Sequence, residues 1–165
     1  MNEPEKRQTV LRILRRNGRL STAQIAERAQ LNADEVDAII AACEHDGTIF
    51  GYHTLIDPEQ LGQEEVRAII EVSIEPERDR GFDCIARNIS KFEQVADVTL
   101  VSGTFDLMLT VVGASLQEVA HFVATQLAPI DGVKHHTTHF VLKKYKEAGF
   151  CREIDEDHER LPITP

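Results

Sequence analysis

The chain has 165 residues and a formal net charge of −10, with 42% hydrophobic and 28% charged residues. This composition is ordinary for a globular protein and excludes a disordered or collagen-like chain. No apolar run approaches the ~20 residues that a membrane span needs, and the first ten residues lack the apolar segment of a secretory signal, so we expect a cytoplasmic protein with no membrane partner.

The first 46 residues predict three short helices separated by tight turns. Gly18 suits the end of the first helix, because glycine is the usual left-handed cap. Ser21 is suited to cap the second helix and Asn32 the third. The third helix has the clearest pattern, since its apolar residues recur at helical spacing: Val36, Ile39, Ile40 and Cys43. Three short helices in this arrangement are typical of a helix-turn-helix module.

Charge is distributed unevenly along the chain. Residues 1–31 carry seven Lys and Arg against three acidic residues, whereas residues 32–46 carry five acidic residues and no Lys or Arg. The basic block is a hint of contact with nucleic acid. The last segment, residues 147–165, is acidic, and we expect it to form a solvated extension.

A β-prone stretch follows the helices. Residues 48–58 read TIFGYHTLIDP, in which Asp-Pro ends the run of strand-forming residues. We interpret this stretch as a wing or a linking strand that leaves the first domain.

The second half alternates strands and helices. Strands are predicted from apolar alternation and helices from 3.6-residue spacing, and Ser115-x-x-Glu118 is a capping box. The short turn at residues 102–104 makes the two strands beside it an antiparallel hairpin. The predicted elements are strand 66–74, helix 82–89, strand 95–101, strand 105–112, a helix from 115 to Pro129 and a long strand 133–145. This βαββαβ order indicates an α+β protein with a ferredoxin-like second domain.

One of these strands is apolar on both faces. Leu107, Leu109 and Val111 share one face with Phe105, while Met108 and Val112 lie on the other. Two helices cover only one face of a four-stranded sheet, and an exposed apolar face marks an association surface. The strand therefore predicts a homodimer formed through the sheet.

Three motifs in order give the sequence a resemblance to the Lrp/AsnC family, the feast/famine regulators, over roughly residues 4–146. The first runs from Asp46 to Pro58 (DGTIFGYHTLIDP) and is followed by Leu61-Gly62; it is similar to the family's G-x-I-x-G-Y stretch between two domains. The second is the VSGTFDL of residues 101–107, and the third is Ile130-Asp131-Gly132-Val133, followed by Thr137-Thr138 and by KKYK at 143–146.

The resemblance implies a transcription regulator with four parts. These are a winged helix-turn-helix DNA-binding domain at 1–50, a linking strand at 51–63, a ferredoxin-like ligand-sensing and oligomerisation domain at 64–146 and the acidic tail at 147–165. It further implies dimers that assemble further, often into octamers, and small effectors, commonly amino acids, that bind between the C-terminal domains.

The third helix departs from the family pattern, because residues 32–46 have no Lys or Arg where members carry Arg. Phosphate neutralisation drives most of the affinity for double-stranded DNA. The candidate contacts to the backbone therefore lie on the earlier helices, helped by Lys6 and Arg7, while the third helix offers an adenine-reading or phosphate-binding Asn and an Asp that could accept from cytosine amino groups. The predicted DNA-binding residues are Arg15, Arg16, Arg19, Arg28, Asn32 and Asp37.

The turn of the second motif is a candidate effector site. A glycine there allows close approach of a ligand to the backbone, and Asp106 has the charge to hold an amino group. The predicted effector-binding residues are Gly103, Thr104, Phe105, Asp106, Thr137 and Thr138. The alternative is ordinary turn chemistry, with Gly for the bend and Asp for a local side-chain bond.

The histidines and cysteines of the sequence do not indicate a metal site or a catalytic site. His135 and His139 share a face of the last strand whereas His136 points away, and we interpret these histidines as surface or dimer-seam residues, with no metal site. Cys43, Cys84 and Cys151 are predicted to be reduced thiols. The sequence has no P-loop, G-x-G-x-x-G, G-x-S-x-G or H-E-x-x-H motif, so we expect no cofactor and no enzymatic activity.

Two functional hypotheses remain open. In the first, the protein is a DNA-binding regulator whose oligomeric second domain responds to an amino acid or a similar metabolite. In the second, it is a metabolite-sensing or protein-interaction module with a vestigial helix-turn-helix that does not bind DNA. The acidic third helix favours the second hypothesis.

Overall fold

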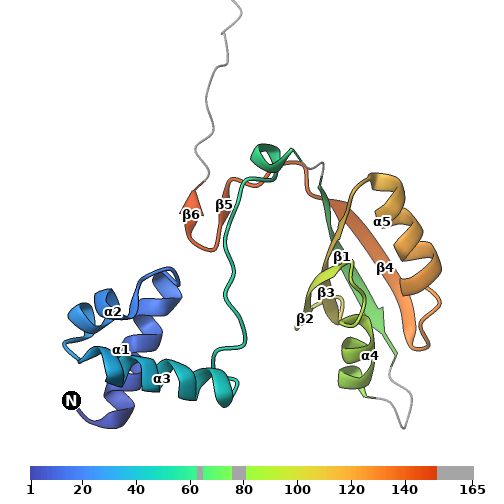
Figure 1. Cartoon of the computed structure of the whole chain (residues 1–165). Coiled ribbons are helices and arrows are strands. Elements are labelled where there is room, and N and C mark those ends of the chain that lie inside the picture. Colours follow the sequence, from blue (N-terminus) through green and yellow to red (C-terminus); the bar gives the residue numbers. More distant parts are fainter. Residues whose placement is uncertain (63–64, 76–80, 152–165) are drawn as a thin grey trace, which may run out of the picture. The chain divides into compact units, whose positions relative to one another are not determined.

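A computed structural model describes residues 1–62, 65–75 and 81–151, and the chain divides into two compact units, residues 1–55 and 56–165 (Figure 1). The first unit holds three helices, and the second holds a four-stranded sheet with its own helices.

The first unit consists of α1 (Glu3–Arg16), α2 (Thr22–Ala29) and α3 (Ala33–His45), which confirms the three predicted helices. Each helix begins with a reciprocal capping box, in which the cap side chain and the third helical residue satisfy each other's backbone N–H groups. The caps are Asn2, Ser21 and Asn32. The core between the helices consists of the buried side chains of Val10, Ile25, Ala26 and Val36.

The linking strand expected at residues 51–63 is not formed. Residues 51–57 have no regular structure, Pro58–Leu61 form a short 3-10 helix, η1, and residue 63 lies outside the described residues. A strand needs a second strand to satisfy its backbone groups, and none of the described residues pairs with this stretch. Its large apolar side chains are consequently exposed, with Tyr52 at 57% and Ile56 at 52%.

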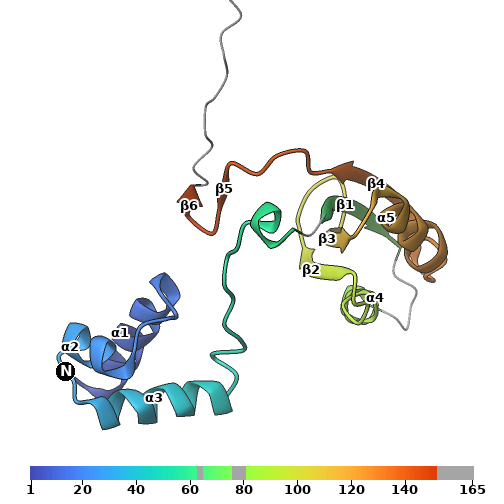
Figure 2. The same ribbon diagram turned by 45° about the horizontal axis from the view of Figure 1, so that its top comes forward.

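The second unit has the predicted βαββαβ order, shown from two directions in Figures 1 and 2. Its strands are antiparallel neighbours in the order β2-β3-β1-β4. The elements are β1 (Val66–Ile74), α4 (Phe82–Ile89), β2 (Val95–Leu100), β3 (Leu107–Gly113), α5 (Leu116–Phe122) with its π-helical continuation η2 (Val123–Leu127), and β4 (Val133–Phe140).

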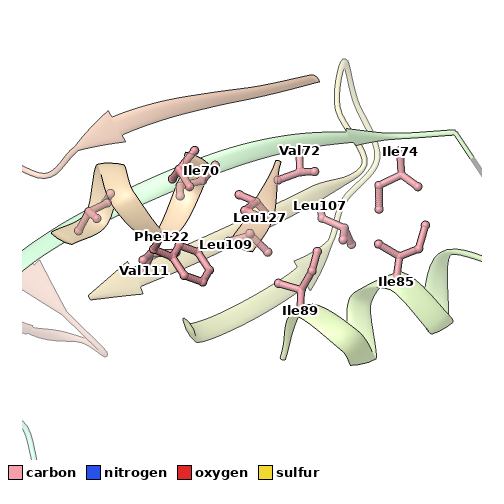
Figure 3. Packing of buried hydrophobic residues seen from close by; sticks show 13 residues of the cluster. Ile70, Val72, Ile74, Ile85, Ile89, Leu107, Leu109, Val111, Phe122 and Leu127 are labelled. Atoms are coloured by element: carbon pink, nitrogen blue, oxygen red, sulfur yellow. The ribbon is translucent and has the colours of Figure 1, made fainter. Parts of the chain in front are cut away.

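The core of this unit lies between one face of the sheet and the two helices (Figure 3). Alternate residues of β1 and β3 point into it, and Ile70, Leu107 and Leu109 are fully buried. Helix α4 contributes Ile85 and Ile89, and the α5–η2 segment contributes Phe122 and Leu127. The helices therefore cover one face of the sheet and leave the other face without a helix.

The last strand is shorter than predicted, because β4 ends at Phe140 and not at residue 145. Its partner β1 begins at Val66, and the last bond between them runs from the Val141 N–H to the Arg67 carbonyl at 2.8 Å. A strand ends where its neighbour ends, whatever its own side chains favour.

A small hairpin replaces the start of the expected extension. Strands β5 (Lys146–Glu147) and β6 (Phe150–Cys151) pair around Ala148 and Gly149, which both have positive φ, 45° and 92°. Two successive residues with positive φ are characteristic of the type I′ turn that suits a two-residue hairpin. The rest of the predicted extension, residues 152–165, lies outside the described residues.

Candidate functional site

Exposed arginines gather at the end of α1 and in the turn after it. Arg12, Arg15 and Arg16 share one side of α1 by their i, i+3, i+4 spacing, and Arg19 lies in the turn that leads to α2. All four are exposed, and no ion pair of theirs is recorded among the described residues. We call these four residues the arginine surface. Arg28 is also exposed but lies in the last turn of α2, about 9 Å along that helix from its start.

Lys6 and Arg7, which we expected to support these arginines, hold internal partners instead. The Lys6 ammonium donates to Glu35 of α3 at 2.6 Å, and Arg7 donates to Asp46 and to the Thr48 hydroxyl, each at 2.6 Å. Hydrogen bonds from the Thr48 side chain and backbone, together with the Arg7 guanidinium, lower the pKa of Asp46 to about 2. These cations therefore fasten α1 to α3 and are engaged before any ligand arrives.

The acidic groups of α3 are largely satisfied within the first unit. The Asp37 carboxylate accepts from the Thr22 hydroxyl at 2.7 Å, and the Glu44 carboxylate accepts from the Tyr52 phenol at 2.8 Å. The hydrogen bond from Lys6 lowers the pKa of Glu35. Apart from His45 in the last turn, the exposed residues of this helix are small or acidic: Ala33, Asp34, Asp37, Ala38, Ala41, Ala42 and Glu44.

Asn32 has both a capping role and free donors. Its Oδ1 accepts from the Glu35 N–H at 2.9 Å, so this oxygen is committed to the helix start. Its side-chain NH₂ group has no partner among the residues that the structure describes, which leaves it available to an acceptor.

The turn of residues 101–106 is fixed by Asp106. The Asp106 carboxylate accepts from the Ile74 N–H at 2.7 Å, and the Asp106 N–H donates to the Val72 carbonyl at 3.0 Å. One carboxylate oxygen therefore completes the end of β1, which is a structural role with a distant partner and not the local turn bond considered as the alternative. Gly103 and Thr104 are exposed at the tip, and Phe105 is half-buried.

The two predicted threonines do not face one pocket. Thr137 lies opposite Glu71 on the face without helices, whereas Thr138 lies opposite the buried Ile70 on the helix-covered face. Successive residues of a strand point to opposite faces, so this separation follows from β4 being a regular strand. The structure keeps Thr138 apart from Thr137.

The helix-free face combines apolar and titratable side chains. Ile69 and Met108 are 38% and 37% exposed there. His139 Nε2 lies 3.5 Å from the Glu71 carboxylate, and the Thr137 hydroxyl lies 3.4 Å from His135 Nε2. The register confirms that Met108 and Val112 occupy the face opposite the core. Among the described residues no group of three or more potential ligands could hold a metal ion.

A groove of about 700 Å³ lies away from the predicted effector residues. Exposed polar side chains of α4 line it, together with Ile130 and Asp131 of the turn before β4. None of the residues from 103 to 106 contributes to this groove, nor do the threonines of β4.

A family-domain match and a full-length relative both place the chain among transcriptional regulators. Residues 67–149 match the Lrp/AsnC ligand binding domain. The whole chain is 39% identical over 166 residues to the HTH-type transcriptional regulator YugG of Bacillus subtilis, with 100% of each sequence covered. The chain belongs to the Lrp/AsnC family of transcriptional regulators.

More distant members resemble this Lrp/AsnC chain as well. The leucine-responsive regulatory protein of Haemophilus influenzae is 27% identical, with 86% of this chain and 84% of the relative covered. A transcriptional regulator of Neisseria meningitidis, solved as a complex with L-Met, is 26% identical with a TM-score of 0.68, covering 89% of this chain and 93% of that one. Escherichia coli AsnC, at 18% identity and a TM-score of 0.65, shares the fold over 89% of this chain and 96% of its own.

Sequence reasoning overlooked two features of this Lrp/AsnC regulator. Arg12 belongs with the predicted Arg15 and Arg16, and its spacing from them on one helix was a sufficient signal. The hydrogen bond from Tyr52 to Glu44 joins a β-prone stretch to a helix, and no short sequence motif predicts it. No helix among the described residues is long and apolar enough to cross a membrane.

Proposed function

We propose that this regulator binds double-stranded DNA through its first unit and a small effector, such as an amino acid, through its second unit, acting in the cytoplasm as a homodimer that assembles further into octamers. The observation that carries the DNA-binding part is the arginine surface, whose four guanidinium groups have no partner within the described part of the chain. Unpaired cations on one surface are what a phosphate backbone requires.

The side chains of the first unit support two kinds of DNA contact, one to phosphates and one to base edges. Arg15, Arg16 and Arg19 serve as phosphate contacts, with Arg28 as a separate contact at the far end of α2. Helix α3 supplies the side that faces the bases, where small residues such as Ala38 permit a close approach and the Asn32 amide donates to an acceptor. Asp37 accepts from a cytosine amino group with the oxygen that Thr22 leaves free. Residues 48–52, which bond to α1 and α3 through Thr48 and Tyr52, occupy the position in the chain where a wing was expected.

An α-amino acid suits the tip of the 101–106 turn. Gly103 has open space around it, and only one oxygen of Asp106 is recorded in a bond, so the other is available to an ammonium group. Thr104 and Phe105 flank this position, and Thr137 is the candidate contact from β4. The complex of the meningococcal relative with L-Met supports this ligand class for the family.

The helix-free face of the sheet is the proposed dimer surface. Ile69, Met108 and Val112 provide an apolar centre on neighbouring strands, and covering it with the same face of a second copy removes it from water. The polar groups around it, such as Glu71 and His139, then meet across the interface.

The test is a titration of fluorescent DNA from upstream of the protein's own gene, with scrambled DNA of the same length as a reference. We expect the full chain to prefer its own DNA and the Arg15→Ala/Arg16→Ala variant to bind at least about tenfold more weakly. Lys143→Ala/Lys144→Ala, two cations of the second unit, is the matched control and should retain affinity.

The alternative function, a sensor that does not bind DNA, is favoured by the absence of Lys and Arg from α3. It predicts equal and weak binding to both DNA fragments at low salt, together with a thermal shift on adding amino acids. Equal binding in the titration would therefore replace the first function with the second.

A further inference from the structure

We infer that Tyr52 is a positioning residue that holds residues 48–52 against the first unit, so that the free tether between the two units begins at His53. The stretch around Tyr52 has no strand or helix, and its order therefore depends on individual contacts. Only the last consequence of this inference rests on the proposed DNA binding.

Tyr52 contacts two separate parts of the first unit. Its phenol donates a hydrogen bond of 2.8 Å to Glu44 Oε1 in the last turn of α3. Its ring lies at the turn after α1, where a Cβ placed on Gly18 would be 3.4 Å from the Tyr52 Cδ1 atom. Partial burial and the bond to Glu44 raise the pKa of Tyr52 above its ordinary value of 10. The side chain therefore joins the linking stretch to the turn between α1 and α2 and to the last turn of α3.

The residues before Tyr52 are held by a second set of bonds. Thr48 donates its N–H to Asp46 at 2.9 Å and accepts from Arg7, and the Ile49 N–H donates to the Cys43 carbonyl at 2.9 Å. Residues 53–56 form no hydrogen bond or ion pair with any other residue that the structure describes. The recorded contacts therefore stop at Tyr52, and the 55-residue boundary of the first unit includes it.

Chymotrypsin measures where the held segment ends, because it cuts after large apolar residues, aromatic residues and leucine among them, and does so only where the chain can open. Phe50 is 98% exposed, so exposure alone predicts rapid cleavage after it. The inference predicts the opposite order in the full chain: mass spectrometry detects cleavage after Leu55 first and after Phe50 later.

Substitution of Tyr52 isolates the phenol. Tyr52→Phe keeps an aromatic cleavage site and removes only the hydroxyl, and we expect cleavage after Phe50 to rise about fivefold while cleavage after Leu55 stays constant. Glu44→Ala should give the same increase, and the double variant should add nothing to either single change. Tyr145→Phe, the same change at the chain's other tyrosine, should alter neither rate. Faster wild-type cleavage after Phe50 than after Leu55, or no change in Tyr52→Phe, overturns the inference.

The consequence for DNA is a change in tether length. Loss of the phenol bond frees residues 50–56, seven residues in place of the four from 53 to 56. Effective concentration falls with about the −3/2 power of tether length, so a dimer on DNA with two sites should bind about twofold more weakly, whereas binding to a single site should not change. Absence of all DNA binding refutes the proposed function alone, because the cleavage pattern needs no DNA. An equal loss on both DNA fragments would assign Tyr52 to direct contact and overturn its positioning role.

Discussion

The carboxylate of Asp106 is the group whose replacement best separates folding from ligand binding in the second unit. It accepts from the Ile74 N–H at 2.7 Å in a part-buried position, across 32 residues of sequence. A hydrogen bond to a charged acceptor contributes about 1.5–3 kcal/mol, and partial exposure reduces this to about 1–2 kcal/mol. Asp106→Ala should therefore lower the Tm of this unit by at least about 4 °C.

Asp106→Asn distinguishes the bond from the charge. The amide oxygen can still accept from the Ile74 N–H, so we expect about half of the stability loss of Asp106→Ala. If the remaining charge holds the ammonium group of an effector, Asp106→Asn also abolishes the thermal shift that an amino acid gives the parent.

The assay is thermal unfolding followed by circular dichroism, with each of the twenty amino acids added in turn. Asp97→Asn, an exposed acid on β2, is the matched control and should change neither Tm nor ligand response. An Asp106→Ala variant as stable as the parent would refute the structural role. An Asp106→Asn variant that retains the full ligand response would remove Asp106 from the effector site.

Three further substitutions test other parts of the structure. Gly132 has φ of +92°, and a Cβ there would lie 2.6 Å from the Ile85 Cδ1 atom. Gly132→Ala should therefore destabilise the second unit by about 1–3 kcal/mol, as measured by urea unfolding. An unchanged urea midpoint would contradict this packing. Because hydrogen bonds from Thr48 and Arg7 lower the pKa of Asp46 from 3.8 to about 2, its contribution to stability is present above pH 3.8 and is lost as pH falls towards 2. Asp46→Asn should therefore flatten the acid limb of the unfolding profile, and an identical limb would show that the bonds of Asp46 to Thr48 and Arg7 are not linked to folding. Met108→Asp places a charge beside Glu71 on the helix-free face and should shift the protein towards monomer in light scattering, whereas an unchanged mass would place the dimer contact elsewhere.

Sequence patterns predicted the elements whose stability is local or whose periodicity is regular. The bounds of β1 at Val66 and Ile74 and of α4 at Phe82 and Ile89 agree with the prediction, because alternation and helical spacing are complete in those segments. Asn32 was predicted as a helix cap for the same reason, since the residue that caps a helix lies beside it in the sequence.

Features that depend on a distant partner could not be predicted in this way. The β-prone residues around Phe50 form no strand because propensity does not supply a second strand. Strand β4 ends at Phe140 because its antiparallel partner β1 begins at Val66 and offers no further residues to pair with. The hydrogen bond from the Ile74 N–H to Asp106 and the pairing of Lys6 with Glu35 join residues about 30 positions apart. By contrast, the opposite orientation of Thr137 and Thr138 follows from strand geometry alone and could have been predicted.

The salt dependence of binding to DNA from upstream of its own gene tests the central claim most directly, since each released counterion reports a phosphate contact. For the full chain, the account predicts a log–log slope of affinity against salt steeper than about −3, made shallower by about 2 or more in Arg15→Ala/Arg16→Ala. A slope near zero, or the same slope in the parent and the variant, would contradict the assignment of the arginine surface to DNA.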